Sequence, residues 1–137
     1  MGSTIGRGIA LDIGLLVLRA AAGLMIAGHG YGKVRKLLEG DYGFADPVGI
    51  GPTASLVLAA FAEFVCALLV VAGLRTRWAA LPVVATMLVA LFIVHAADPW
   101  GDKELAAVYA AAFLALAFTG GGRLSVDALF GRPGSRA

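Results

Sequence analysis

Residues 54–73 read ASLVLAAFAEFVCALLVVAG, an apolar run of 20 residues in which Glu63 is the only charged side chain. A helix that crosses a bilayer needs about 20 mostly apolar residues. Lipid offers no hydrogen-bond partner to backbone amides and carbonyls, so a span of this kind must be helical. The sequence contains four apolar stretches of comparable length, at residues 9–28, 54–73, 78–95 and 103–119. These stretches predict an all-α polytopic membrane protein, a four-transmembrane-helix bundle.

The composition of the chain agrees with a membrane protein. Of its 137 residues, 60% are hydrophobic and 15% are charged, and the mean hydropathy is +0.88. Soluble domains carry about 25% charged residues, so a water-soluble globule is excluded. The formal net charge of +2 gives no reason to expect a nucleic-acid partner. The length fits a single membrane domain over residues 1–137, with a short cytoplasmic tail at residues 120–137, and the lipid bilayer is the expected partner.

The basic residues outside the spans predict the orientation of the chain. Six lie on the side of the two termini and the second turn: Arg7, Arg75, Arg77, Arg123, Arg132 and Arg136. Four lie on the side of the first and third loops: Lys33, Arg35, Lys36 and Lys103. Basic residues outside the spans favour the cytoplasmic side of a membrane. We therefore expect both the N-terminus and the C-terminus in the cytoplasm.

The connections between the predicted spans differ in length. Residues 73–77, Gly-Leu-Arg-Thr-Arg, form a tight turn that makes the second and third spans antiparallel neighbours. The first connection, about residues 29–53, is the only long one, and its glycines and prolines suit a folded-over lid or a flexible link. After the last span, Ser125 is a candidate N-cap for a short helix at residues 126–130.

Charged side chains inside the spans need a partner or a use, because a charge at the bilayer centre costs about 2.5–3.5 kcal/mol on insertion scales. Arg19 lies ten residues after the start of the first span, and Glu63 lies nine residues after the start of the second, antiparallel span. At a rise of about 1.5 Å per residue, both reach a similar depth. We therefore predict a buried intramembrane ion pair between Arg19 and Glu63. Asp12, almost on the same helical face as Arg19, is a candidate second partner.

The predicted pair has two interpretations. Two charges that cancel can simply fix which helices face each other. Intramembrane charges also mark sites that bind ligands or handle protons. The sequence leaves both interpretations open. In either case, replacing Arg19 with Ala is expected to be severe, because it would leave Glu63 without its counter-charge.

A second group of polar residues gathers at the outer ends of the predicted spans. His29 and Tyr31 close the first span and are followed by Lys33, while His95 closes the third span and Glu104 opens the fourth. By depth, these five residues converge at the outer mouth of the bundle as a candidate ligand-binding site. Histidine titrates near neutral pH and can exchange hydrogen bonds with a quinone oxygen. The alternative is that each histidine is only a partly solvated side chain at a helix end.

Few other residues indicate chemistry. Two histidines and the single Cys66, without a short-spaced ligand pair, predict no metal site and no haem or iron–sulfur cluster. Cys66 is either a reactive thiol or, as buried cysteines more often are, a small hydrophobe. Alanines at positions 107, 111 and 115 form a small-residue seam, typical of close helix packing or of an interface with another protein. No catalytic residue is identified, and catalysis itself is left open.

Several short motifs keep a characteristic order along the chain. They are Arg19, Gly28-His29-Gly30-Tyr31-Gly32-Lys33, Glu63, Gly73-Leu74-Arg75-Thr76-Arg77, His95, Glu104 and Gly120-Gly121-Gly122-Arg123-Leu124-Ser125-Val126-Asp127. With this order and spacing, over about residues 11–129, the chain resembles the DoxX family of small four-helix bacterial membrane proteins.

The resemblance implies a four-helix protein of the bacterial inner membrane. It groups the chain with quinone-linked thiosulfate oxidoreductase subunits and with membrane components of thiol and oxidative-stress systems. Two functions follow as expectations. The first is a redox membrane subunit whose outer-side pocket takes a small hydrophobic ligand, with a quinone as the candidate cofactor. The second is a non-catalytic anchor or assembly partner for an oxidoreductase, alone or as a homo-oligomer. A transporter built from four helices would need to dimerise.

Overall fold

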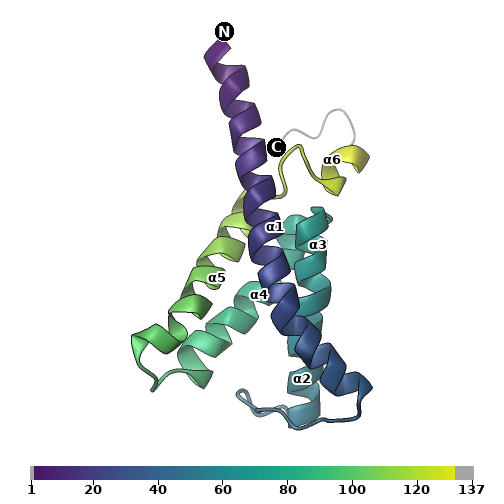
Figure 1. Ribbon diagram of the computed structural model, residues 1–137, viewed down its shortest axis with the longest axis vertical. Coiled ribbons are helices and arrows are strands. Elements are labelled where there is room, and N and C mark those ends of the chain that lie inside the picture. Colours follow the sequence, from purple (N-terminus) through teal and green to yellow (C-terminus); the bar gives the residue numbers. More distant parts are fainter. Residues whose placement is uncertain (1, 132–137) are drawn as a thin grey trace.

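The computed structural model describes residues 2–131, with side chains from residue 6 onward, and every regular element in this range is helical. In chain order the elements are α1 (Gly2–Leu38), α2 (Pro52–Ala60), η1 (Phe61–Cys66), α3 (Ala67–Ala72), α4 (Thr76–Val89), η2 (Ala90–Val94), α5 (Trp100–Thr119) and α6 (Val126–Phe130). The labels η1 and η2 denote π-helical turns that continue their neighbours without a break. The described chain therefore contains four long helical segments and one short terminal helix (Figure 1). The predicted all-α class is confirmed.

Three of the long segments have the length and hydropathy to cross a membrane. They are Gly6–Leu38, Pro52–Ala72 and Thr76–Val94. The fourth, α5, is also 20 residues long, but Asp102, Lys103 and Glu104 lie in its first two turns. The chain is therefore an α-helical membrane protein in which three helices carry the full signature of a span.

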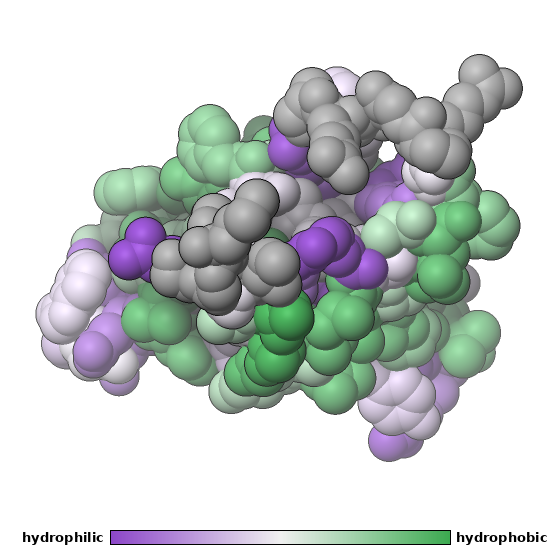
Figure 2. All heavy atoms as spheres, turned by 90° about the horizontal axis from the view of Figure 1, so that it is seen from above, coloured by the Kyte–Doolittle hydropathy of each residue, from purple (hydrophilic) through white to green (hydrophobic). Residues whose placement is uncertain are grey.

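Apolar side chains cover the outside of the bundle as well as its core. Phe113, Ile26 and Leu56 are fully buried, while Leu11 and Phe92 are 62% and 69% exposed. Seen from above, hydrophobic side chains surround much of the periphery (Figure 2). Such a surface is unfavourable in water but is matched to lipid acyl chains.

Two glycines bring α1 against the α2–η1–α3 segment. A Cβ atom at Gly30 would lie 2.5 Å from the carbonyl oxygen of Glu63, and one at Gly23 would overlap Val71. Small residues let helix backbones approach closely within membranes. The two contacts set the register between the helices, with Gly30 level with Glu63 and Gly23 level with Val71. On the other side of the bundle, α4 and α5 lie side by side (Figure 1).

The turn between α3 and α4 is fixed by α6. Gly73 and Arg75 adopt positive φ values of 76° and 48°. The Asp127 carboxylate accepts hydrogen bonds from the backbone amides of Arg75, at 2.8 Å, and Thr76, at 3.2 Å, and so caps the start of α4. Ser125 accepts a hydrogen bond from Ala128 N at 3.3 Å, which confirms the predicted N-cap of α6.

Gly30→Ala is expected to lower the free energy of unfolding by about 1–3 kcal/mol, because the new methyl group must push α1 away from the Glu63 backbone. Gly28→Ala is the matched control, since a Cβ there meets nothing within 4 Å and alanine favours a helix. Thermal unfolding of the detergent-solubilised variants measures both. Equal midpoints for the two variants would contradict the close approach at Gly30.

Candidate functional site

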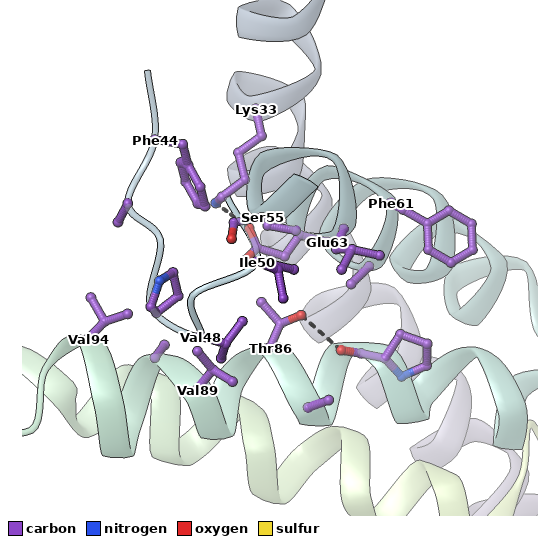
Figure 3. A pocket seen from close by; sticks show the side chains of 18 residues that line it. Lys33, Phe44, Val48, Ile50, Ser55, Phe61, Glu63, Thr86, Val89 and Val94 are labelled. Atoms are coloured by element: carbon purple, nitrogen blue, oxygen red, sulfur yellow. Dashed lines mark hydrogen bonds and ion pairs between the residues drawn. The ribbon is translucent and has the colours of Figure 1, made fainter. Parts of the chain in front are cut away.

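A cavity of about 570 Å³ lies between the α2–η1 segment and the α4–η2 segment, below the loop of residues 41–51 (Figure 3). This volume falls in the range of about 300–1,000 Å³ that is usual for small-molecule sites. Most of its lining is apolar: Phe44, Ala45, Pro47, Val48, Ile50, Leu58, Ala59, Phe61, Ala62, Pro82, Ala85, Val89, Ala90 and Val94. Four polar side chains complete the lining, those of Lys33, Ser55, Glu63 and Thr86. The cavity thus suits a mainly hydrophobic molecule with a small polar group.

An ion pair forms the charged part of the wall. Lys33 Nζ donates to Glu63 Oε2 at 2.5 Å, and the two side chains are 22% and 6% exposed. The ammonium also lies 6.0 Å from the centre of the Phe44 ring, within the range of a cation–π contact. A lysine has three N–H donors and a carboxylate has several acceptor sites, so the pair retains hydrogen-bonding capacity beyond its own contact.

The helical turn that carries Glu63 is unusual. Glu63 lies in η1, where the hydrogen bonds connect residues five apart instead of four. π-helical turns occur often at functional sites. The turn coincides with the close approach of Gly30, so Lys33, three residues further along α1, reaches Glu63 from the neighbouring helix. No signal in the sequence distinguishes this turn from ordinary α-helix.

The loop over the cavity is fastened by Asp46. One carboxylate oxygen accepts from Ile50 N at 3.0 Å and from Ser55 Oγ at 3.1 Å, and the other accepts from Gly51 N at 3.0 Å. On the opposite wall, Thr86 Oγ1 donates to the Pro82 carbonyl at 2.9 Å, so its hydroxyl proton is committed and its oxygen remains an acceptor. The loop is therefore tied to the start of α2 by side-chain hydrogen bonds.

At the start of the same loop, Lys36 and Asp41 form an exposed pair at 2.8 Å. The Lys36 hydrogen bond, together with the Gly43 amide, holds the pKa of Asp41 below its ordinary value. Asp41 is therefore ionised at neutral pH and anchors the chain where α1 ends.

The structure corrects the predicted ion pair between Arg19 and Glu63. Arg19 is fully buried, and it donates to the carbonyl oxygens of Val71 at 2.9 Å, Val70 at 3.3 Å and Leu124 at 2.6 Å. The carbonyls of Val70 and Val71 lie in the last turn of α3, where the helix dipole favours a cation, and Val70 O also accepts from Gly73 N at 3.0 Å.

The error has a physical origin in the length of α1. The prediction matched depths from assumed span ends, but α1 continues ten residues past residue 28, to Leu38. The glycine contacts place Gly30 beside Glu63, and Arg19 lies 11 residues earlier, or about 16 Å away along the helix. Lys33, and not Arg19, is therefore the counter-charge of Glu63.

Asp12 is also not a partner of Arg19. Its carboxylate accepts from Arg123 Nε at 2.6 Å and from Arg123 N at 2.9 Å. This double contact ties the segment after α5 to α1, which explains why an acidic residue is tolerated there.

The five residues predicted as a ligand site are divided among several places. Lys33 lines the cavity, whereas His29 stacks edge-on to Tyr109 with ring centres 6.5 Å apart. The other three are also outside its lining: Tyr31 lies 6.3 Å from Phe64 by ring centres, His95 Nδ1 contacts Asp98 Oδ2 at 2.7 Å, and Glu104 is exposed. The connection between η2 and α5 points away from the end of α1 (Figure 1). Residues at equal depth are for this reason not neighbours.

Sequence reasoning missed most of the cavity lining. Phe44, Val48 and Ile50 come from a loop without periodicity, and Ala85 and Val89 look like ordinary core positions in a span. Cys66 is 2% exposed inside η1 and is free. Among residues 2–131, no group of three or more His, Cys, Asp or Glu side chains comes together as a metal site.

A family model described as DoxX matches residues 14–96 of the chain. The matched region contains both partners of the Lys33–Glu63 pair and every residue that lines the cavity. No curated protein and no solved structure matches the chain.

Double-mutant cycles on the free energy of unfolding test which charges interact. Removing one partner of a buried pair costs about 3–5 kcal/mol, and less is expected for Lys33 because 22% of its side chain is exposed. Lys33→Met and Glu63→Gln together should therefore cost less than the sum of the two single changes. Arg19→Met and Glu63→Gln should be additive, since the two residues share no contact. Coupling in the second cycle, and none in the first, would contradict the pairing.

Proposed function

Because the chain belongs to the DoxX family, we propose that it is an integral membrane subunit of a quinone- or thiol-linked redox system, and that its cavity binds a quinone-like or other small hydrophobic ligand. The observation that carries this proposal is a mainly apolar cavity of about 570 Å³ whose wall holds one hydrogen-bonded ion pair. Sites for small hydrophobic molecules combine an apolar lining with a few fixed polar groups.

The polar groups suit the head of a quinone. A quinone carbonyl oxygen accepts hydrogen bonds, and the Lys33 ammonium has N–H donors beyond the one given to Glu63. The hydroxyl group of a quinol donates, and the second oxygen of the Glu63 carboxylate accepts. Both redox forms therefore find a partner in the same ion pair.

The apolar walls suit the rest of such a molecule. The lining runs along α4 and η2 from Pro82 to Val94, which is 12 residues or about 18 Å. Leu58 and Phe61 also line the cavity and remain 57% and 49% exposed. A hydrophobic tail can therefore leave the cavity past these two side chains and continue into the lipid.

The side chains around the cavity are not redox-active. Electrons for a bound quinone would come from a partner oxidoreductase, and the chain would hold the quinone and its protons in place. The proposal therefore includes a partner protein and assigns no catalytic residue to this chain.

A second candidate function is a non-catalytic anchor or assembly partner. It is supported by the alanine seam of α5, where Ala111 and Ala115 are exposed. Small exposed residues on a membrane helix let another helix pack closely. The partner would be an oxidoreductase subunit or a second copy of this chain.

We further propose that α5 is the fourth span, in the bacterial inner membrane with both termini in the cytoplasm. Its 20 residues match a bilayer crossing, and it packs along α4. An even number of spans puts both ends of the chain on one side. The basic residues near the termini and the α3–α4 turn favour the cytoplasm for that side.

A short-tailed quinone analogue is expected to stabilise the purified protein against thermal unfolding. At a concentration of 100 times Kd, it should raise the free energy of unfolding by about 2.7 kcal/mol. Lys33→Met combined with Glu63→Gln should weaken this stabilisation, because it removes the ammonium donors and the carboxylate but leaves no unpaired charge. Ala85→Trp should abolish it by filling the cavity.

The matched controls are His29→Ala and His95→Ala, which lie outside the cavity lining and should respond to the analogue like the unmodified protein. Loss of stabilisation in the histidine variants alone would place the ligand elsewhere. If the analogue stabilises no form of the protein, the anchor function is favoured.

A further inference from the structure

A second cavity, of about 550 Å³, lies at the opposite end of the bundle, between the start of α4 and the segment that follows α5. Its charged lining consists of Arg75, Arg77, Arg123 and Asp127. It lies outside the ligand cavity described above and shares no lining residue with it. Asp12 pairs with Arg123 from outside the lining, so three guanidinium groups stand against two carboxylates and the cavity keeps a net positive charge.

The carboxylate and one guanidinium are already engaged. Asp127 accepts from the amides of Arg75 and Thr76, and Arg123 donates to Asp12. The side chains of Arg75 and Arg77 are exposed and make no hydrogen bond to another side chain or backbone group within residues 2–131. Two guanidinium groups are therefore free to bind an anion at this site.

The base of the cavity holds a further polar group. Thr76 is 1% exposed, and its hydroxyl has no hydrogen-bond partner in the described part of the chain. Gly121 lies directly opposite, where a Cβ atom would be 2.8 Å from Thr76 Oγ1. At Gly120 a Cβ atom would be 3.2 Å from Arg77 Nε. Gly120 thus leaves room for the Arg77 side chain, and Gly121 leaves room for the unsatisfied hydroxyl of Thr76.

Exposed apolar side chains flank this basic cavity. Trp78 is 72% exposed, Leu124 is 49% exposed, and Leu129 and Phe130 of α6 are each 80% exposed. The hydrogen bond from Asp127 N to the Gly73 carbonyl, at 3.0 Å, holds α6 beside the end of α3 (Figure 1). Exposed aromatic residues beside arginines are typical of the interface between lipid headgroups and acyl chains.

We propose that this cavity binds the phosphate group of an anionic phospholipid. Arg75 and Arg77 contact the phosphate oxygens, since guanidinium groups match phosphate geometry, and the acyl chains lie against Trp78 and α6. The recognised chemistry, a phosphate oxyanion, is shared with free inorganic phosphate. The apolar side chains beside the cavity favour the lipid, because inorganic phosphate has no apolar part that could contact them.

Native mass spectrometry of the detergent-solubilised chain tests the proposal with phosphatidylglycerol, phosphatidylcholine and inorganic phosphate. We expect phosphatidylglycerol to bind most tightly, because the choline cation of phosphatidylcholine is repelled by the arginines. Arg75→Asn and Arg77→Gln should each weaken its binding about fivefold, the equivalent of about 1 kcal/mol per basic residue near a membrane surface. Asparagine is chosen at Arg75 because it tolerates the positive φ of 48°.

Arg35→Gln is the matched control. Arg35 is an exposed arginine in the last turn of α1, away from this cavity, and it is paired with Glu39. It should bind phosphatidylglycerol as the unmodified chain does. Arg77→Gln, on an exposed position of α4, suffices if Arg75→Asn fails to fold. Equal binding of the two lipids, or unchanged binding in the arginine variants, would overturn the proposal. Full displacement of phosphatidylglycerol by millimolar phosphate would show that the cavity binds the free anion, and would overturn the proposal that it binds a lipid.

Discussion

A carboxylate buried in a helix bundle within lipid requires a counter-charge, and Lys33 supplies it for Glu63 across 2.5 Å. This contact determines the geometry around it. Lys33 can reach Glu63 only because Gly30 allows α1 to approach the η1 backbone. The paired side chains then form the charged wall of a cavity that is otherwise mainly apolar. The same interaction therefore joins two helices and supplies the charged groups of the cavity wall.

The two ends of the bundle are built differently. At one end, Arg19 binds carbonyls in the last turn of α3 and that of Leu124, while Arg123 binds Asp12, so a buried and an exposed arginine tie three segments together. At the other end, the α2–η1 and α4–η2 segments separate, and the loop fastened by Asp46 covers the space between them. Arginine contacts therefore hold one end of the bundle together, whereas the other end contains a cavity that a loop covers.

The sequence predicted the fold better than the site. Hydropathy located the four long helical segments, because lipid demands long apolar runs, but it did not predict that α1 continues to Leu38. The turn at 73–77 and the cap at Ser125 follow from local chemistry. The partner of Arg19 was not predictable, since backbone carbonyls at a helix end leave no mark in the sequence. Depth arithmetic also failed for Glu63, because the register of α1 depends on glycine contacts and not on span ends. The loop that covers the cavity has no periodicity from which its position could be inferred.

Photoaffinity labelling tests the central claim most directly. A short-tailed quinone that carries an azide would be activated in membranes containing the protein, and the modified residues would be located by peptide mass spectrometry. If the cavity beside Lys33 and Glu63 is the ligand site, the label is found on residues 44–61 and 82–94. Labelling confined to α5, around Glu104 and Val108, with none on those two segments, would contradict it.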